Sequence, residues 1–388
     1  MDYRKLVSRA DLILEGPVPR PDDGLPIGNG IMGTVIWTTP AALHYQLNRV
    51  DVYASGCESR SFFTRHQDYG YACAGLDVQC ADVGADVFTD SGVRQQIKVY
   101  DAHAEIDGEG VKTDSFCCAD RDVMVVTVDD GREQPASLGA VLRMMREPVV
   151  QRFNHRAESG FTGDGNTATL TQRFSEGSFF CSSAVALRWV GSEATVRQRT
   201  EREMVAYAAP ATGARQLLVA SAATFDPDED VGTKAIKLLD DAAKEGVESL
   251  RKTTERWWHE YWSRSYVSLH SDDGVADKVE AFHTYFQYII GSCSRGQYAP
   301  NFGGLLFSAR GDHRDWGVMQ WGNNISCYYL GLSSANRPEV VKPYFQHYFN
   351  MYESLARAAR QQFGAEGIYV PETVWFDGLE EMPDEIAA

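Results

Sequence analysis

Residues 25–37 read Leu25-Pro-Ile-Gly-Asn-Gly-Ile-Met-Gly-Thr-Val-Ile-Trp37, and they contain a Gly-x-Gly-x-x-Gly pattern. In a dinucleotide-binding fold this pattern stands between a strand and a helix. Here Pro21, two aspartates and Pro26 precede the glycines, so we expect no strand to lead into them. The residues after the glycines, 34–37, favour a strand. We therefore predict a tight glycine turn that opens the first strand of a sheet, with dinucleotide binding as the weaker alternative.

The sequence from residue 25 to about 225 has a β-type pattern. Short apolar or alternating runs are separated by clusters of glycine, aspartate, asparagine and serine. Examples of these runs are 34–37, 76–78, 93–99, 124–128, 141–145, 167–170, 184–190 and 216–220. Many short strands at this spacing predict a large antiparallel β-sandwich rather than βαβ units.

The pattern becomes helical after Pro227. Residues 231–262 mix apolar and charged side chains at helical spacing and predict a linker helix, and residues 266–269 look like a short strand. Further helices are predicted at 275 to about 290, at about 318–331 and at about 338–363. We predict three parts: a β-sandwich over residues 1–226, a helical linker over 227–270 and a helical domain over 271–388.

Composition narrows the possible functions. The chain has 388 residues, 44% hydrophobic and 23% charged, as expected for a globular protein of two domains or part of a larger one. A formal net charge of −17 argues against binding to nucleic acid or to an anionic membrane surface. We find no signal-peptide pattern and no window of membrane-spanning length, and therefore expect a cytoplasmic protein.

The eight cysteines are scattered and lack zinc-site spacing. We expect them to be free thiols that serve as small core residues. Neither a phosphate-binding loop nor a Ser/His/Asp constellation stands out, so we predict no cofactor and no metal site.

The stretch 25–37 resembles the opening of glycosidases of family 95, the α-L-fucosidase-like enzymes, which begin with a Leu-Pro-x-Gly-Asn-Gly turn. Those enzymes continue with Gln-Leu-Asn, matched here by Gln46, Leu47 and Asn48. The resemblance implies an N-terminal β-sandwich, a helical linker and then an (α/α)6 toroid. Because few toroid helices are recognisable here, we expect the chain to be a fragment that exposes apolar surface. We expect Asn29 and Asn48 to have mainly structural roles.

The segment 298–329 is the strongest functional candidate because it mixes charged and amide side chains with aromatic rings. Its polar residues are Arg310, Asp312, His313, Arg314, Asp315, Gln320, Asn323 and Asn324. In the family this place holds a Pro-x-Asn-Leu-Gln-Gly-Ile-Trp loop, a Trp-Gly, an Asn-x-Asn and an aromatic pair. The corresponding residues here are 300–307, Asp315-Trp316-Gly317, Trp321-Gly322-Asn323 and Tyr328-Tyr329.

The match departs from the family at an important point. Both asparagines of the family's Asn-x-Asn hold the attacking water, but here Trp321 replaces the first and only Asn323 remains. The resemblance therefore implies a divergent subgroup with altered specificity. The family's general acid lies farther downstream and matches no residue here. The segment 369–377 is similar to a His-Asn-Thr-Asp-x-Trp pocket loop of the family, which implies that Glu372, Trp375 and Asp377 line the sugar site.

These matches yield a candidate site for a glycosidase. The candidate catalytic residues are Asn323, Glu372 and Asp315; the candidate substrate-binding residues are Asp312, His313, Trp316, Trp321, Asn324, Trp375 and Asp377. The structural alternative is that the tryptophans pack in the core and that the acids near residue 372 are solvated turn residues. We expect Trp257, Trp258 and Trp262 to pack the linker against the sandwich.

The predicted function is that of a glycoside hydrolase that cleaves plant or host oligosaccharides by the inverting step implied by the resemblance. Glycoside hydrolysis generally requires two carboxyl groups that flank the bond. One alternative is a sugar phosphorylase or lyase on the same plan, for which Arg310 and Arg314 are the candidate anion-binding residues. Another is a non-catalytic carbohydrate-binding protein or an inactive fragment.

Overall fold

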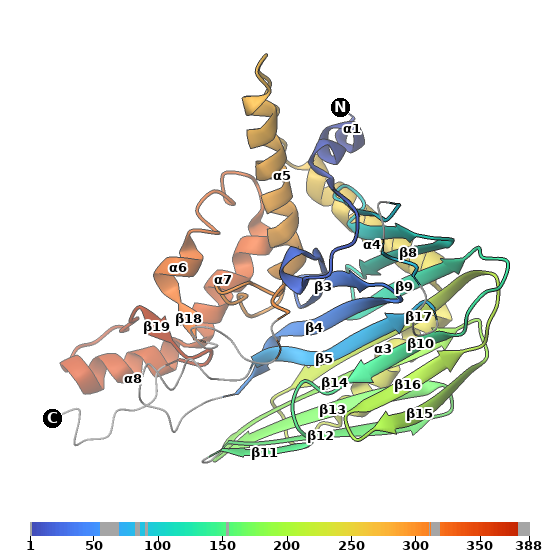
Figure 1. Ribbon diagram of the computed structural model, residues 1–388. Helices are drawn as coiled ribbons and strands as arrows, with labels where there is room; N and C mark the ends of the chain where they lie inside the picture. The colour runs from blue at the N-terminus through green and yellow to red at the C-terminus, as the bar shows by residue number, and fades with distance from the viewer. Residues whose placement is uncertain are drawn as a thin grey trace.

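The fold is built from two antiparallel sheets that lie face to face, with helices gathered beside them (Figure 1). The computed structural model describes residues 2–54, 70–81, 86–89, 92–152, 155–309, 311 and 319–378. A short helix, α1 (Tyr3–Val7), precedes the first strand. Within the described residues, no helix combines the length and apolar character needed to cross a membrane.

The larger sheet has ten strands among the described residues. Their spatial order is β1 (Leu12–Glu15), β6 (Arg94–Lys98), β7 (His103–Gly108), β8 (Val111–Cys117), β9 (Val123–Asp130), β17 (Gly213–Thr224), β14 (Phe179–Val190), β13 (Thr167–Glu176), β12 (His155–Asp164) and β11 (Val149–Arg152). The second sheet has seven described strands. Their order is β15 (Ala194–Thr200), β16 (Glu203–Ala208), β10 (Leu138–Arg143), β5 (Gly70–Gln79), β4 (Ala42–Tyr53), β3 (Met32–Thr39) and β2 (Leu25–Gly28). Every predicted β run overlaps one of these strands, so the antiparallel sandwich is confirmed.

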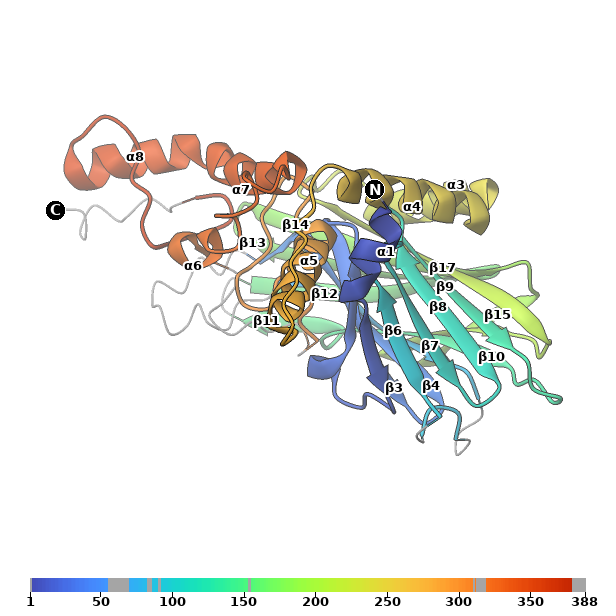
Figure 2. The same cartoon turned by 90° about the horizontal axis from the view of Figure 1, so that it is seen from above.

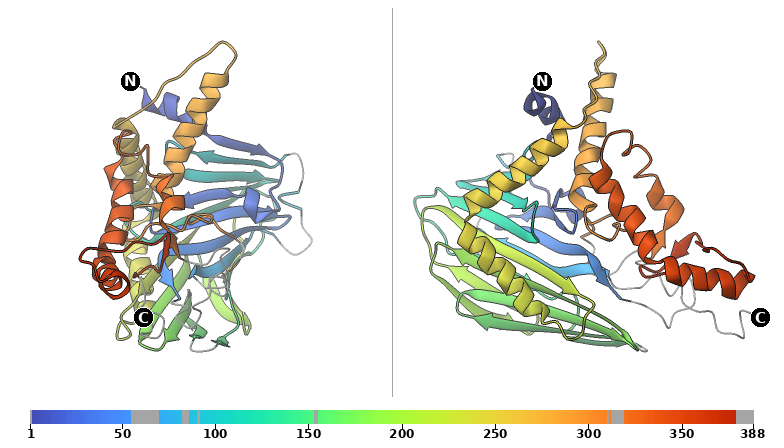
Figure 3. Two further views of the ribbon diagram at one scale, coloured as in Figure 1. Left: turned by 90° about the vertical axis from the view of Figure 1, so that its left-hand side faces the viewer. Right: turned by 180° about the vertical axis from the view of Figure 1, so that it is seen from behind.

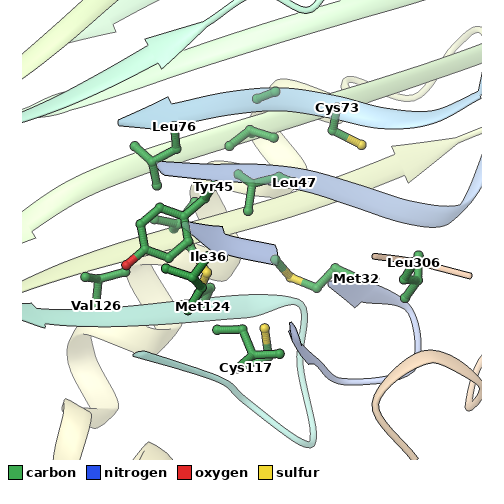
Figure 4. Packing of buried hydrophobic residues seen from close by; sticks show 14 of the residues in the cluster. Met32, Ile36, Tyr45, Leu47, Cys73, Leu76, Cys117, Met124, Val126 and Leu306 are labelled. Atoms are coloured by element: carbon green, nitrogen blue, oxygen red, sulfur yellow. The ribbon is translucent and has the colours of Figure 1, made fainter. Parts of the chain in front are cut away.

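The main core fills the space between the two sheets (Figure 4). Ile36 and Leu76 of the smaller sheet face Met124 and Val126 of the larger one, and all four side chains are buried. Burying an aliphatic side chain of this size stabilises the fold by about 1.5–3 kcal/mol. Tyr45 shares this interior, where its buried hydroxyl hydrogen-bonds to a serine of β8. The alternating pattern of the strands therefore produces the sandwich.

The glycine turn joins β2 to β3 as a hairpin. This corrects our expectation that no strand leads into the glycines, because Leu25–Gly28 pairs antiparallel with β3. Pro26 is tolerated because β2 is the outermost strand of its sheet, where a missing N–H breaks no ladder. At Gly30 the backbone φ is +90°, a conformation that strongly favours glycine. The Asn29 side-chain oxygen accepts hydrogen bonds from the N–H groups of Ile31 and Met32.

The linker consists of two helices, α3 (Val231–Glu245) and α4 (Val247–Ser263), rather than the single helix predicted. Gly246, whose φ is +85°, separates them. Asp230 caps α3 by accepting hydrogen bonds from the N–H groups of Gly232 and Thr233. The right-hand view of Figure 3 shows both helices, in yellow, in front of the larger sheet. Apolar residues of α3 and α4 form a second core with strands of that sheet.

Three tryptophans of α4 behave as packing residues, but their principal neighbours differ from those expected. Trp258 and Trp262 are buried, and the Trp258 ring lies 5.4 Å from the Tyr288 ring of α5 (Val275–Cys293). The Trp257 ring lies 3.8 Å from the guanidinium carbon of Arg295. These rings therefore pack the linker against α5 and the segment that follows it, rather than against the sandwich alone.

The predicted strand over residues 266–269 is wrong. No strand is assigned between α4 and α5, a stretch that the structure describes in full. The Leu269 N–H donates to the Glu280 carboxylate at 2.6 Å, and the Tyr266 hydroxyl donates to the same carboxylate. Side-chain bonds to α5 thus take the place of a strand partner.

The remaining helices are α6 (Gly322–Ser326), α7 (Pro338–Asn350) and α8 (Tyr352–Phe363), seen from above in Figure 2. Two expectations need correction. The helix predicted at about 318–331 is only the five residues of α6, because residues 320–321 form strand β18. The helix predicted at about 338–363 is two helices, because the Met351 N–H bonds to the Tyr348 carbonyl and closes α7 in a tighter turn.

The described cysteines are free thiols. All are buried except Cys327, whose exposure corrects our expectation that each cysteine is a core residue. Cys327 directly follows α6, in which Asn323 and Asn324 are also exposed. Cys57 lies outside the described residues.

Candidate functional site

Two segments from the candidate site form a small ladder. Strand β18 (Gln320–Trp321) pairs antiparallel with β19 (Thr373–Val374), so that Trp321 lies opposite Thr373. The Gly322 N–H donates to the Glu372 carbonyl at 3.0 Å. The segment that carries Asn323 and Asn324 therefore lies beside the segment that carries Glu372. We call this pair of strands and the adjoining residues 322–324, 372 and 375–378 the ladder site.

The polar residues of the ladder site are accessible. Asn323, Asn324, Glu372 and Asp377 are all exposed. The Asn323 carbonyl accepts a hydrogen bond from the Ser326 hydroxyl at 2.7 Å, which closes the turn of α6. Amides both donate and accept hydrogen bonds and carboxylates accept them, which is the chemistry that sugar hydroxyls require.

The two tryptophans of the ladder site are buried. Trp321 is 6% exposed and Trp375 is 2% exposed. The Trp321 ring packs against Phe302 with the centroids 5.6 Å apart. Both rings therefore present little surface on which a sugar could stack, and their predicted substrate-binding role stays a prediction.

A tight turn fixes the far end of the ladder site. The Trp375 N–H donates to the Gly378 carbonyl, and the Gly378 N–H donates back to the Trp375 carbonyl. Between them, the Phe376 ring is stacked 4.1 Å from Tyr53 and 5.4 Å from Phe225, with interplanar angles of 12° and 13°. This three-ring stack anchors the turn to the ends of β4 and β17, while Asp377 remains exposed.

His347 of α7 also holds the turn. Its Nε2 donates to the Phe376 carbonyl at 2.7 Å, and its Nδ1 accepts from the Ala299 N–H at 3.2 Å, which assigns the neutral tautomer. The side chain is fully buried, and burial lowers the pKa of His347 to about 4. The imidazole thus joins the turn to the segment that leads from α5 toward the predicted loop.

The Gln-Leu-Asn motif holds that loop from the sandwich side. The Asn48 Nδ2 donates to the carbonyls of Leu306 and Ser308, each at 2.8 Å. Gln46 makes two hydrogen bonds with Gly311, donating to its carbonyl and accepting from its N–H. The expected structural role of Asn48 is confirmed. Asn29 is structural as well, because its Nδ2 donates to Asp122 and to a backbone carbonyl.

Part of the predicted site lies outside the described residues. These positions are Arg310, Asp312, His313, Arg314, Asp315 and Trp316. Their predicted roles stay predictions. The described residues on both sides, Gly311 and Gln320, are fixed by hydrogen bonds to Gln46 and Tyr71 of the sandwich.

Sequence reasoning missed several residues that shape the ladder site. Phe376 and His347 act through partners that are distant in sequence, such as Tyr53 and Ala299. The clustering of aromatic residues after residue 369 was the one available signal for Phe376. Nothing in the helical pattern of α7 distinguishes His347 from an ordinary surface histidine.

A separate group of metal-ligating side chains lies on the larger sheet. Among the described residues, His103, Glu105 and Asp114 place one ligand atom each within 4.8 Å of the others. Lys98 pairs with Glu105 at 2.5 Å, and Arg251 pairs with Asp114. Hydrogen bonding from His103 lowers the pKa of Glu105 to about 2. Two protein cations therefore already compensate the two carboxylates.

Comparison with solved structures identifies relatives of the fold. The chain is similar to a putative kojibiose phosphorylase from the human microbiome, with a TM-score of 0.64 and 11% identity. The alignment covers 96% of this chain and 53% of that chain, so this chain spans about half the length of its neighbour. The sequence itself matches no protein-family model and no curated protein.

Two weaker likenesses involve other carbohydrate-active enzymes. One is a bacterial glucoamylase complexed with acarbose, with a TM-score of 0.48, 9% identity and coverage of 95% of this chain and 56% of that chain. The other is a family GH92 inverting mannosidase from Bacteroides thetaiotaomicron, with a TM-score of 0.46, 11% identity and coverage of 82% and 42%. At these TM-scores we base no argument on them. The likeness to the phosphorylase shows a shared fold and does not single out family 95.

Proposed function

We propose that this chain belongs to an enzyme that hydrolyses a glycosidic bond of an oligosaccharide and that the ladder site contributes to its active site. The observation that carries the proposal is the β18–β19 pairing, which sets two distant segments with exposed amide and carboxylate residues beside each other. The fold shared with a putative phosphorylase of kojibiose, together with the motif resemblance, supports a carbohydrate as the substrate. More specifically, we propose a fucosidase-like specificity that is altered because Trp321 replaces the first asparagine of the family's Asn-x-Asn motif.

Within this proposal each group has a distinct task. Asn323 orients the attacking water or a sugar hydroxyl, because an amide alone is too weak a base to deprotonate water. Glu372 and Asp315 are the candidates for the acid and the base. An inverting mechanism would hold the two carboxyl groups about 6.5–9.5 Å apart to admit the water. The remaining predicted residues, among them Asp312, Asn324 and Asp377, would bind sugar hydroxyls.

We also propose that residues 271–388 belong to an (α/α)6 toroid, in the domain order predicted from the sequence. Two apolar stripes support this. On α5, Val275, Val279 and Phe282 are exposed at helical spacing, with Phe282 74% exposed. On α7, Phe345 and Phe349 are exposed at helical spacing, and Tyr352 at the start of α8 is exposed as well. Stripes of this kind are the faces that neighbouring helices cover in a helical toroid.

A sugar phosphorylase is the second candidate. The observation that favours it is the likeness of the fold to that of a putative kojibiose phosphorylase. A phosphorylase would require an anion pocket, for which Arg310 and Arg314 are the candidates. The same assay distinguishes the two functions, because phosphorolysis depends on inorganic phosphate and hydrolysis does not.

The test is turnover of the longest encoded form on a panel of aryl glycosides, with and without inorganic phosphate. The panel contains α-L-fucoside, α- and β-L-galactoside, α-L-rhamnoside, β-L-arabinoside and α-D-glucoside. Asn323→Ala is compared with Gln198→Ala, which removes an exposed amide from β15 of the sandwich. We expect turnover to fall about a hundredfold in Asn323→Ala and to be unchanged in the control. Absence of turnover with sugar binding retained would instead favour a carbohydrate-binding protein.

A further inference from the structure

A cavity of about 380 Å³ lies where the sandwich, helix α3 and the segment after α5 meet. Its volume is at the lower end of the range for small-molecule sites, roughly 300–1,000 Å³. The walls come from the end of β4, the end of β17, the first half of α3 and residues 296–298. None of these elements belongs to the ladder site, although two cavity residues, Phe225 and Tyr298, contact the Phe376 ring of that site.

Charged groups in the cavity wall are held rigidly. The Arg49 guanidinium is buried, with its side chain 4% exposed, and it pairs with Asp51 at 2.7 Å and with Asp122 at 2.9 Å. A further hydrogen bond joins Arg49 to the Ser221 carbonyl, and Asn29 donates to the second oxygen of Asp122. The two carboxylates keep partial exposure, and each carboxylate oxygen has lone pairs for a further donor.

The rest of the lining is largely apolar and aromatic. Phe225 and Tyr298 are half-buried rings whose centroids lie 6.0 Å apart. Ile31, Val50 and Leu238 complete the apolar lining. At the rim, Lys234 and Gln297 are exposed and can donate hydrogen bonds. Flat rings and fixed carboxylates in one cavity suit a ligand with both C–H faces and hydroxyl groups.

We propose that this cavity binds one neutral sugar unit, as a second carbohydrate site apart from the ladder site. The charge balance decides the ligand class. Asp51 and Asp122 both pair with Arg49, and Lys234 pairs with Glu229 at 3.0 Å, so each charged group of the lining already has a partner of opposite charge. A phosphate would face two carboxylates, and a metal ion would face a guanidinium bonded to both. A neutral polyol can donate to the carboxylates without an ionic penalty.

This inference rests on the proposed function only in its choice of a carbohydrate, and the cavity can be tested without turnover. The probes are D-glucose, D-galactose, D-mannose and L-fucose, measured by calorimetry and by saturation-transfer NMR. Asp51→Asn weakens the carboxylate acceptor. Gln297→Trp fills the cavity from its exposed rim and leaves Arg49 and its partners untouched. Gln198→Ala on β15 is the control.

We expect at least one of the sugars to bind the wild type and its affinity to fall about tenfold in Asp51→Asn and in Gln297→Trp. Binding should be unchanged in Gln198→Ala. The inference would be overturned if none of the four sugars bound the wild type. It would also be overturned if both cavity variants bound the sugar with the affinity of the wild type. Binding of phosphate or Mg²⁺ that is lost in Gln297→Trp would overturn the choice of a neutral ligand. Sugar binding in the cavity without glycosidase turnover would count against the proposed function alone.

Discussion

Replacing His347 by phenylalanine tests how the ladder site is attached to the rest of the chain. His347 is the single side chain that bonds both to the Phe376 carbonyl and to the Ala299 N–H within the described residues. His347→Phe keeps an aromatic ring against Tyr298, whose ring centroid lies 5.0 Å away, and removes only the two hydrogen bonds. The substitution therefore isolates the polar contribution.

The magnitude follows from the two backbone groups that are left without a partner. An unsatisfied buried donor or acceptor costs about 1–3 kcal/mol, so we expect His347→Phe to lose about 2–5 kcal/mol at pH 7.5. The wild type should also depend on pH. The folded state, in which the pKa of His347 is about 4, binds fewer protons than the unfolded state, in which the pKa is about 6.5. Stability is therefore lost as pH falls from about 6.5 toward 4, and the loss reaches about 2.5 kcal/mol at pH 4.5.

The assay is urea unfolding followed by tryptophan fluorescence, at pH 7.5 and pH 4.5. The difference in stability between wild type and His347→Phe should be large at pH 7.5 and should shrink by about 2.5 kcal/mol at pH 4.5. His270→Ala, which removes an exposed histidine, should show no such convergence. A gap between wild type and His347→Phe that is the same at both pH values would refute the assignment of a neutral, doubly bonded imidazole.

Three further substitutions test the contacts between the helical part and the sandwich, each by thermal and urea unfolding. Gly30→Ala should lose about 2–4 kcal/mol, because φ is +90° and a Cβ there would overlap the Arg295 side chain. Asn48→Asp should destabilise the protein by at least about 1–3 kcal/mol, because an acceptor would replace the donor that faces two carbonyls. Phe376→Ala should lose about 3–5 kcal/mol by emptying the ring stack on Tyr53. If any of these variants were as stable as the wild type, the corresponding contact would not stabilise the fold.

Local patterns predicted the sandwich well because its strands carry their own signal. Thr167–Glu176 and Phe179–Val190, for example, are long apolar or alternating runs bounded by turn residues, and each forms a strand of the larger sheet. Two strands were missed, Leu12–Glu15 and Leu25–Gly28. The second was hidden by Pro26, which is acceptable there only because the strand lies at the edge of its sheet. Edge position depends on the whole sheet and cannot be seen from the residue itself.

Helix boundaries in the C-terminal part were harder to predict, because tertiary partners decide them. Trp321 could have continued a helix, but pairing with Thr373 places it in a strand. Gly246 separates the two linker helices by a positive φ that the helical spacing around it did not reveal. The motif resemblance singled out the segments of Asn323 and Glu372, whereas the backbone contact between these segments and the anchoring of the turn by His347 needed the fold itself.

The measurement that tests the central claim most directly is kcat for Glu372→Gln on a phenyl and a 2,4-dinitrophenyl glycoside of the sugar identified by the panel. The matched control is Glu201→Gln, which neutralises an exposed acid between two strands of the smaller sheet. If Glu372 is a general acid of the ladder site, kcat should fall about a hundredfold or more on the phenyl glycoside. The fall should be much smaller on the dinitrophenyl glycoside, whose leaving group needs no proton. Equal kcat for Glu372→Gln, Glu201→Gln and wild type on both substrates would contradict the assignment of acid catalysis to the ladder site.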